Sequence, residues 1–173
     1  QGNTDTITQL IKAETIDIAI IEGIDHHPEI TYVPFVKDEL VLVTNASNRL
    51  TRLEHLTKEQ LYDVPLIMRE AGSGTLDVLH RAMGKAGIDF SRLRVEIKLE
   101  STIAIKQYLL YSDAAAFLSI QSIIQELSHR QLAIIDVEEL EIYRDFQFIQ
   151  LHGHHLKLVE LFKRFCMSNY NYR

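Results

Sequence analysis

The chain has 173 residues, of which 46% are hydrophobic and 24% charged, a composition typical of a globular domain with a sizeable core. Its longest apolar run is the five residues 114–118, which excludes a membrane-spanning helix, since such a helix needs about 20. With 18 basic and 24 acidic residues the net charge is -6, the opposite of the balance that a DNA-binding surface shows.

Two further features concern the cellular compartment. The single cysteine, Cys166, cannot form an internal disulfide, which suits a reducing environment. Residues 1–5 contain neither the basic nor the apolar part of a signal peptide. Together these features predict a cytoplasmic location, without a membrane partner and without direct DNA contact by this chain.

The first third of the chain predicts one helix and two strands. Residues 4–14 have the periodicity of an amphipathic helix, with Thr4 or Asp5 as its N-cap. The short β-branched run 17–21 predicts a strand that is buried on both faces. A long extended stretch of alternating polarity then covers residues 30–44.

The middle of the chain continues the alternation of helix and strand. Residues 57–61 predict a short helix whose first residue has capping-box spacing to a glutamine. Residues 64–68 predict a strand. The glycine-rich turn 72–75 then opens a helix over 76–86, which Gly87 ends.

The same alternation continues to the C-terminus. The remaining predicted strands are 94–99, 114–119, 132–137 and 144–151, and the remaining helices are 101–111, 122–129 and 156–167. Strands separated by helices indicate an α/β fold, with parallel sheets covered by helices on both faces.

Three strand-to-helix turns could bind a ligand. In an open α/β sheet, ligands bind outside the carboxyl ends of the strands, where helix N-termini offer unpaired N–H groups and partial positive charge. Hydroxyl groups in such turns can donate to carboxylates, sulfates or phosphates. Alternatively, these residues are N-caps that satisfy their own helices. The candidate binding residues are Glu22, Gly23, Ser73, Thr75, Ser101 and Thr102.

The sequence lacks the motifs of several enzyme classes. No lysine follows the second glycine of 72–75, so this turn is not a Walker loop, and it lacks the third glycine of a dinucleotide fingerprint. No Gly-x-Ser-x-Gly elbow occurs, and Cys166 lies between apolar residues as a structural cysteine does. The histidines at 26–27 and 152–155 are more typical of solvated loops than of a metal site. We therefore expect no cofactor and no metal.

Four motifs in series carry a family likeness. They are Asp-Ile-Ala-Ile-Ile-Glu-Gly at 17–23, Asp-Glu-Leu-Val-Leu-Val at 38–43, Pro-Leu-Ile-Met-Arg-Glu-Ala-Gly-Ser-Gly-Thr at 65–75 and Glu-Ser-Thr-Ile-Ala-Ile-Lys at 100–106. In this order and spacing, the chain resembles the effector-binding domain of LysR-type transcriptional regulators over essentially its whole length. The form of the third motif resembles the branch that includes regulators of sulfur and cysteine metabolism.

The resemblance implies a fold like that of periplasmic binding proteins, with two α/β subdomains joined by two crossover strands. Subdomain I would hold residues 1–37 and 148–173, and subdomain II would hold residues 38–147. The crossings would fall near residues 36–39 and 146–150. The family pattern also implies that the opening strand, helix and second strand of subdomain I are not part of this chain.

The resemblance also implies a site between the subdomains. Thr102, at the cap of its helix, matches a family position whose hydroxyl meets the effector, and Glu22 matches another. The implied effector is a small anion such as sulfate, sulfite or a carboxylate. An acidic Glu22 would repel an anion, so either the effector carries a cationic group or Glu22 turns away.

Dimer formation is a further implication of the family, as a homodimer or tetramer. The helix 76–86 and the strand 94–99 would supply the contact. The candidate interface residues are Leu76, Leu79, Met83, Val95 and Ile97.

The function implied is that of a ligand-sensing domain of a DNA-binding transcription regulator, with DNA contacted through a winged helix-turn-helix domain outside this chain. It is not an enzyme on this interpretation. The alternative is a solute-binding protein of a transporter with the same fold, which should begin with a signal peptide or a lipid-anchored cysteine. A third hypothesis, a small dehydratase, needs a carboxylate or histidine in the cleft, and Glu22 alone qualifies by position.

Overall fold

The computed structural model describes residues 2–22, 27–153 and 156–170. Every predicted helix and strand has a counterpart in it. The helices are α1 (Thr4–Lys12), α2 (Lys58–Leu61), α3 (Gly74–Lys85), α4 (Thr102–Leu110), α5 (Ile124–Ser128) and α6 (Lys157–Tyr170). The strands are β1 (Ala19–Glu22), β2 (Ile30–Asn45), β3 (Leu66–Met68), β4 (Val95–Lys98), β5 (Ala115–Ser119), β6 (Leu132–Ile135) and β7 (Ile142–Leu151).

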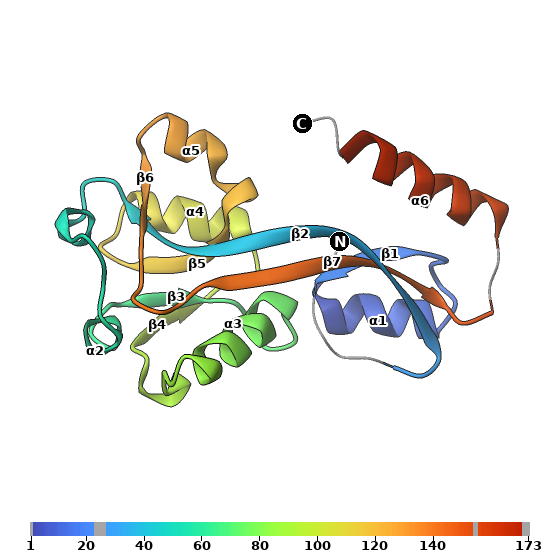
Figure 1. Cartoon of the computed structure of the whole chain (residues 1–173), viewed down its shortest axis with the longest axis horizontal. Coiled ribbons are helices and arrows are strands. Elements are labelled where there is room, and N and C mark those ends of the chain that lie inside the picture. The colour runs from blue at the N-terminus through green and yellow to red at the C-terminus, as the bar shows by residue number, and fades with distance from the viewer. Residues whose placement is uncertain (1, 23–26, 154–155, 171–173) are drawn as a thin grey trace.

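One sheet runs through the molecule, in the order β1-β7-β2-β5-β3-β4, with β6 also paired to β2. The 16-residue strand β2 makes this continuity possible, because its first part pairs with β7 and its last part pairs with β5 and β6. Figure 1 shows β2 and β7 as a long pair between two groups of elements. We call α1, β1 and α6 the small end, and α2 to α5 with β3 to β6 the large end.

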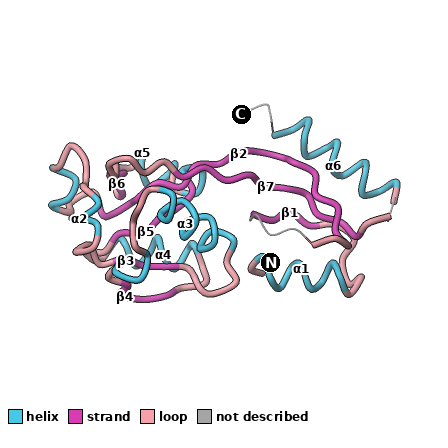
Figure 2. Tube along the Cα trace, turned by 60° about the horizontal axis from the view of Figure 1, so that its bottom comes forward, coloured by secondary structure: helices cyan, strands magenta, loops and turns pink. Residues whose placement is uncertain are grey.

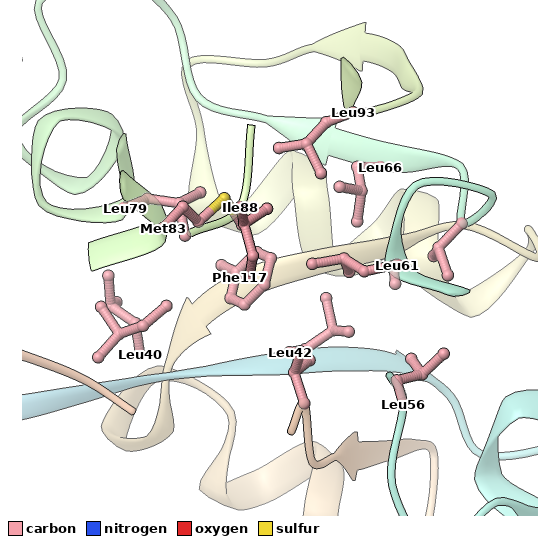
Figure 3. Close-up of a cluster of buried hydrophobic side chains, with 14 of the residues drawn as sticks. Leu40, Leu42, Leu56, Leu61, Leu66, Leu79, Met83, Ile88, Leu93 and Phe117 are labelled. Carbon is pink, nitrogen blue, oxygen red and sulfur yellow. The ribbon is translucent and has the colours of Figure 1, made fainter. Parts of the chain in front are cut away.

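The large end is buried on both faces of its sheet. Along β2, Leu42 faces one core with Met83 of α3 and Phe117 of β5, a cluster drawn in Figure 3. The next residue, Val43, faces a second core with Ile105 of α4. Successive strand side chains point to opposite faces, so α3 and α4 cover the two sides.

The small end has a thinner core. Ile11 of α1 packs on Ile21 of β1 and Ile149 of β7, and all three side chains are buried. Figure 2 shows α1 and α6 on opposite sides of this end of the sheet. Helix α6 buries Val159 but leaves Leu158 exposed.

The predicted parallel sheet is correct for the centre of the large end and wrong elsewhere. Strand β3 runs parallel to β4 and β5, whereas β2 pairs antiparallel with β5, β6 and β7, and β1 pairs antiparallel with β7. Strands β6 and β7 follow one another along the same edge of β2 without an intervening helix, and both run antiparallel to it. The proposed subdomain boundaries fall within β2 and β7 and stay a prediction.

Strand β1 is not buried on both faces as predicted. It lies at the edge of the sheet, where Ile21 is buried but Ile20 is 40% exposed. An apolar β-branched run predicts a strand but does not distinguish a central strand from an edge strand.

The predicted caps of two helices are wrong by one or two residues. Helix α1 is capped by Asn3, whose side chain accepts from the N–H of Thr6 at 2.9 Å, rather than by Thr4 or Asp5. Helix α4 is capped by Ser101 rather than Thr102. In both cases the hydroxyl of the following threonine is left outside the cap and can serve another purpose.

Candidate functional site

A cavity of about 590 Å³ lies where the small and large ends meet. It is within the size range of small-molecule sites. Its walls come from α1 and β1 on one side, from α3, α4 and β5 on the other, and from β2 and β7 between them. We call it the central cavity.

Three helices of at least nine residues begin at the central cavity. Thr4 of α1, Gly74 of α3 and Thr102 of α4 are each the first residue of their helix, and each lines the cavity. The first N–H groups of a helix lack intrahelical acceptors and carry partial positive charge. The cavity wall is therefore suited to an anion.

The side chain of Ser73 bears on whether the turn 72–75 binds a ligand or only caps helix α3. Ser73 is the N-cap of α3, yet its side chain makes no capping hydrogen bond. Its hydroxyl is buried and has no hydrogen-bond partner among the described residues, and Ser73 is one of the residues that line the cavity. Burying an unpaired hydroxyl costs free energy, so a polar ligand there would remove an existing penalty.

Glu22 and Thr75 join the two ends of the molecule across the cavity. The Thr75 hydroxyl donates to Oε1 of Glu22 at 2.5 Å. The main-chain oxygen of Glu22 accepts from the hydroxyl of Thr4 at 2.8 Å. Glu22 therefore ties the end of β1 to the first turns of both α1 and α3.

Arg144 is the buried cation of the site. Its Nε and Nη2 atoms each lie 2.7 Å from Oδ2 of Asp38, the residue opposite it in the β2–β7 register. Its Nη1 donates to the Thr75 hydroxyl at 2.9 Å and also forms an ion pair with Glu22. Its guanidinium lies 4.8 Å from the ring centroid of Phe146.

Burial shifts the pKa values of the central pair. It lowers the pKa of Arg144 to about 10, which leaves the guanidinium charged near neutral pH. Burial also raises the pKa of Asp38, although hydrogen bonds from the Ser119 hydroxyl and the backbone of Glu39 oppose this shift. With both carboxylates ionised, the Glu22–Asp38–Arg144 cluster has one negative charge in excess.

A second arginine lines the cavity but is already paired. Nε and Nη2 of Arg69 donate to the two carboxylate oxygens of Glu70, at 2.8 and 3.0 Å. Burial acts to raise the pKa of Glu70, but the hydrogen bonds and charge of Arg69 outweigh it, so the pKa is lowered. This pair is electrically neutral and adds little attraction for an anion.

The structure brings four of the six candidate binding residues to the cavity: Glu22, Ser73, Thr75 and Thr102. Ser101 is exposed, lies outside the residues that line the cavity and caps α4. Gly23 lies outside the described residues. Glu22 does not turn away from the cavity, because Arg144 and Thr75 hold it there.

The candidate dimer residues divide between core and surface. Leu79 and Met83 are buried in the chain's own core, where the apolar face of an amphipathic helix belongs, so they offer no surface to a second copy. Leu76 and Ile97 are partly buried, and Val95 is 39% exposed. A dimer contact at α3 and β4 stays a prediction and would depend on the exposed side of these elements.

The described ranges contain neither a metal site nor a membrane-spanning helix. No group of three or more His, Cys, Asp or Glu side chains there could hold a metal ion, and the predicted loop histidines 26 and 154–155 fall outside those ranges. No helix within the same ranges is long and apolar enough to cross a bilayer.

Asp38 and Arg144 are not among the site residues predicted from the sequence. A usable signal exists, because side chains alternate in a strand. Asp38 has the same parity as the buried Leu40 and Leu42, and Arg144 has that of Ile142. A charged residue on the apolar parity of a long strand indicates a buried ionic contact.

Comparisons with known proteins agree with one another. The family model described as the LysR substrate binding domain matches residues 1–170. A probable RuBisCO transcriptional regulator of Cyanophora paradoxa is 32% identical over 150 residues, covering 85% of this chain and 46% of the relative. The HTH-type transcriptional regulator CysL of Bacillus subtilis is 24% identical over 172 residues, covering 98% of this chain and 56% of CysL. The chain thus spans about half the length of these curated relatives.

Solved structures share the fold. The regulatory domain of CcmR from Synechocystis PCC6803, in complex with 2-PG, has a TM-score of 0.83 at 26% identity, covering 96% of this chain and 79% of that one. The effector binding domain of QuiR, in complex with shikimate, has a TM-score of 0.82 at 21% identity, covering 97% and 78%. The predicted α/β, periplasmic-binding-protein-like fold is confirmed.

Proposed function

Since this chain belongs to the family of LysR substrate binding domains, we propose that it is the effector-sensing part of a LysR-type transcription regulator and that it binds a small anion in the central cavity. DNA contact would be made by a helix-turn-helix domain elsewhere in the full protein. The net charge of -6 fits a domain that does not itself contact DNA.

The single observation that supports an anion best is the buried hydroxyl of Ser73 at the start of α3, for which residues 2–22, 27–153 and 156–170 offer no hydrogen-bond partner. It lies beside the unpaired N–H groups of the first helical turn, and an anion accepts from both kinds of donor. The hydroxyl of Thr102 lines the same cavity from α4. The complex of the CcmR regulatory domain with 2-PG, at 26% identity to this chain, supports a small ligand for this fold.

The geometry also supports a way of transmitting the binding event. The central cavity has walls from both ends of the molecule, which the β2–β7 pair connects. A ligand that binds one relative arrangement of the two ends more tightly shifts the population toward it, by no more than its differential affinity. The attached DNA-binding domains would respond to that shift, as a homodimer or tetramer.

Two other functions receive less support. The curated relatives are named as transcriptional regulators, which favours regulation over solute transport and over a dehydratase, and favours a cytoplasmic location. The carboxylates of Glu22 and Asp38 are both paired with Arg144, which does not suit a general base. Assignment to the sulfur and cysteine branch stays a prediction.

Titration calorimetry on the intact chain tests the proposal, with sulfate, inorganic phosphate, shikimate and 2-PG as probes. We expect at least one anion to bind, and we expect Ser73→Ala and Thr102→Val to weaken it about tenfold each, the loss of one charge-assisted hydrogen bond. Thr15→Val is the matched control, because Thr15 is exposed, is not among the residues that line the cavity, and follows the C-terminal end of α1, whose N-terminal end faces the cavity. If no probe binds the intact chain, the proposed function is wrong.

A further inference from the structure

Glu22 is the second carboxylate on a single arginine. Asp38 already contacts Arg144 through two nitrogen atoms, and the Ser119 hydroxyl donates to its other oxygen at 2.8 Å. Arg144 is therefore neutralised by its own strand neighbour. The side chain of Glu22 adds a second negative charge to a cluster in which Asp38 already balances the charge of Arg144. Removing this second charge from water costs desolvation free energy.

The carboxylate of Glu22 occupies a position that also suits an anionic ligand. Its oxygens accept from the Thr75 hydroxyl and pair with Nη1 of Arg144, at the first turn of α3. The positive end of a helix stabilises a carboxylate there. The neighbouring Ser73 hydroxyl has no partner in the described part of the chain, so Glu22 satisfies only part of the available donors.

Close contact of the backbones supports the same interpretation. A Cβ atom added to Gly74 would lie 2.2 Å from the main-chain oxygen of Glu22, so the end of β1 rests directly on the start of α3. The carboxylate of Glu22 thus contributes to a contact between the small and large ends. An anion that takes over Thr75 and Arg144 would have to displace the side chain that makes this contact.

We propose that Glu22 is an internal carboxylate that occupies the anion position between Thr75 and Arg144 until an anionic effector displaces it. This inference rests on the proposed function and extends it to specificity and regulation. An effector must carry an anionic group able to exchange with a carboxylate, since a neutral polyol offers Arg144 no charge. The displaced Glu22 releases its side-chain link from β1 to α3, so occupancy of the cavity changes the contact between the two ends.

The test compares Glu22→Gln with Glu54→Gln in the intact chain. Glutamine keeps the size of the side chain and an oxygen that accepts from Thr75, but it removes the competing charge. Glu54 is an exposed residue of the large end, so its variant loses the same net charge away from the cavity. Sulfate, inorganic phosphate and 2-PG are titrated at constant ionic strength, and circular dichroism verifies that each variant is folded.

We expect Glu22→Gln to bind these anions at least tenfold more tightly than the unaltered chain, with Glu54→Gln unchanged. Thr75→Val, which removes the hydroxyl without changing the size much, should abolish the gain. If the unaltered chain binds an anion and Glu22→Gln binds it equally or more weakly, the inference is overturned while the proposed function stands. If neither protein binds any anion, both are overturned.

A spectroscopic measurement adds an independent readout. The carboxyl ¹³C NMR signal of Glu22, identified by its loss in Glu22→Gln, should move on saturation with sulfate as the carboxylate leaves Arg144. A saturated protein in which this signal does not move would contradict displacement, whatever the affinities are.

Discussion

Asp38 and Arg144 lie opposite each other in the β2–β7 register and form a two-point ion pair at 2.7 Å, although 106 positions separate them in the chain. Both residues are buried. The pair joins the two long strands at the point where the small and large ends meet. The ion pair therefore connects two strands that both line the central cavity.

The first prediction concerns this pair. Replacing the cation, in Arg144→Leu, leaves the buried carboxylate of Asp38 and the half-buried carboxylate of Glu22 without a positive charge. We expect the free energy of unfolding in urea to fall by about 3–5 kcal/mol, the usual loss when one partner of a buried ion pair is removed. Arg52→Leu, at an exposed arginine, should change it by less than about 0.5 kcal/mol. Equal effects in the two variants would show that the buried pair does not stabilise the fold.

The second prediction concerns the face of α3. Met83 is fully buried in the large-end core, so Met83→Ala should lower the free energy of unfolding by about 2–5 kcal/mol. Arg81→Ala, on the exposed side of the same helix, should have an effect near zero. Urea titrations of both variants measure this. A small loss for Met83→Ala that depends on protein concentration would instead indicate that Met83 lies in an interface between copies.

The third prediction is a pH dependence. Lys106 of α4 forms an ion pair with Glu126 of α5 at 2.6 Å. Burial acts to raise the pKa of Glu126, but the hydrogen bond and charge of Lys106 outweigh it, so the pKa in the folded chain lies below its ordinary value of 4.5. A lowered carboxyl pKa contributes stability above pH 4.5, and that contribution is lost as the pH falls through the folded value.

Urea unfolding of the unaltered chain and of Glu126→Gln between pH 7 and pH 3 tests this. The variant should be less stable at pH 7 by about 1.5–3 kcal/mol, the range for a hydrogen bond to a charged group. The difference should shrink as the pH falls toward 3, because the stabilisation is lost as the pH passes through the lowered pKa of folded Glu126. Lys106→Met should show the same trend, and a difference that is constant over this range would contradict it.

Local signals were sufficient for the helices and strands. The capping box at Thr57 is present, and Gly87, with a φ of +73°, ends α3 as a left-handed residue should. Register is not a local signal. Alternation in β2 and β7 predicts which side chains share a face, but not that Asp38 meets Arg144, because a register slip of two residues would leave the same side chains on the same face.

The central cavity was therefore predicted in part. Ser73, Thr75 and Thr102 were found because helix N-termini in an α/β chain follow from sequence order. The ion pair of Glu22 could not be predicted, since its partner Arg144 lies 122 positions further along the chain. The sequence suggested two alternatives: a cationic group on the effector, or a Glu22 side chain that turns away from the cavity. Neither included a cation from the chain itself, which is Arg144.

The last prediction uses two glycines of α3. At Gly84 an added Cβ would meet nothing within 4 Å, so Gly84→Ala should raise the free energy of unfolding by about 0.5–1 kcal/mol, because alanine loses less conformational entropy in a helix. At Gly74 the same methyl group would lie 2.2 Å from the Glu22 oxygen and 2.7 Å from the Thr4 hydroxyl. Gly74→Ala must therefore push β1 and α1 away from α3, at a cost of about 1–3 kcal/mol. Thermal unfolding of the two variants should shift the midpoint in opposite directions, and a Gly74→Ala variant as stable as the unaltered chain would mean that the small end does not rest on the start of α3.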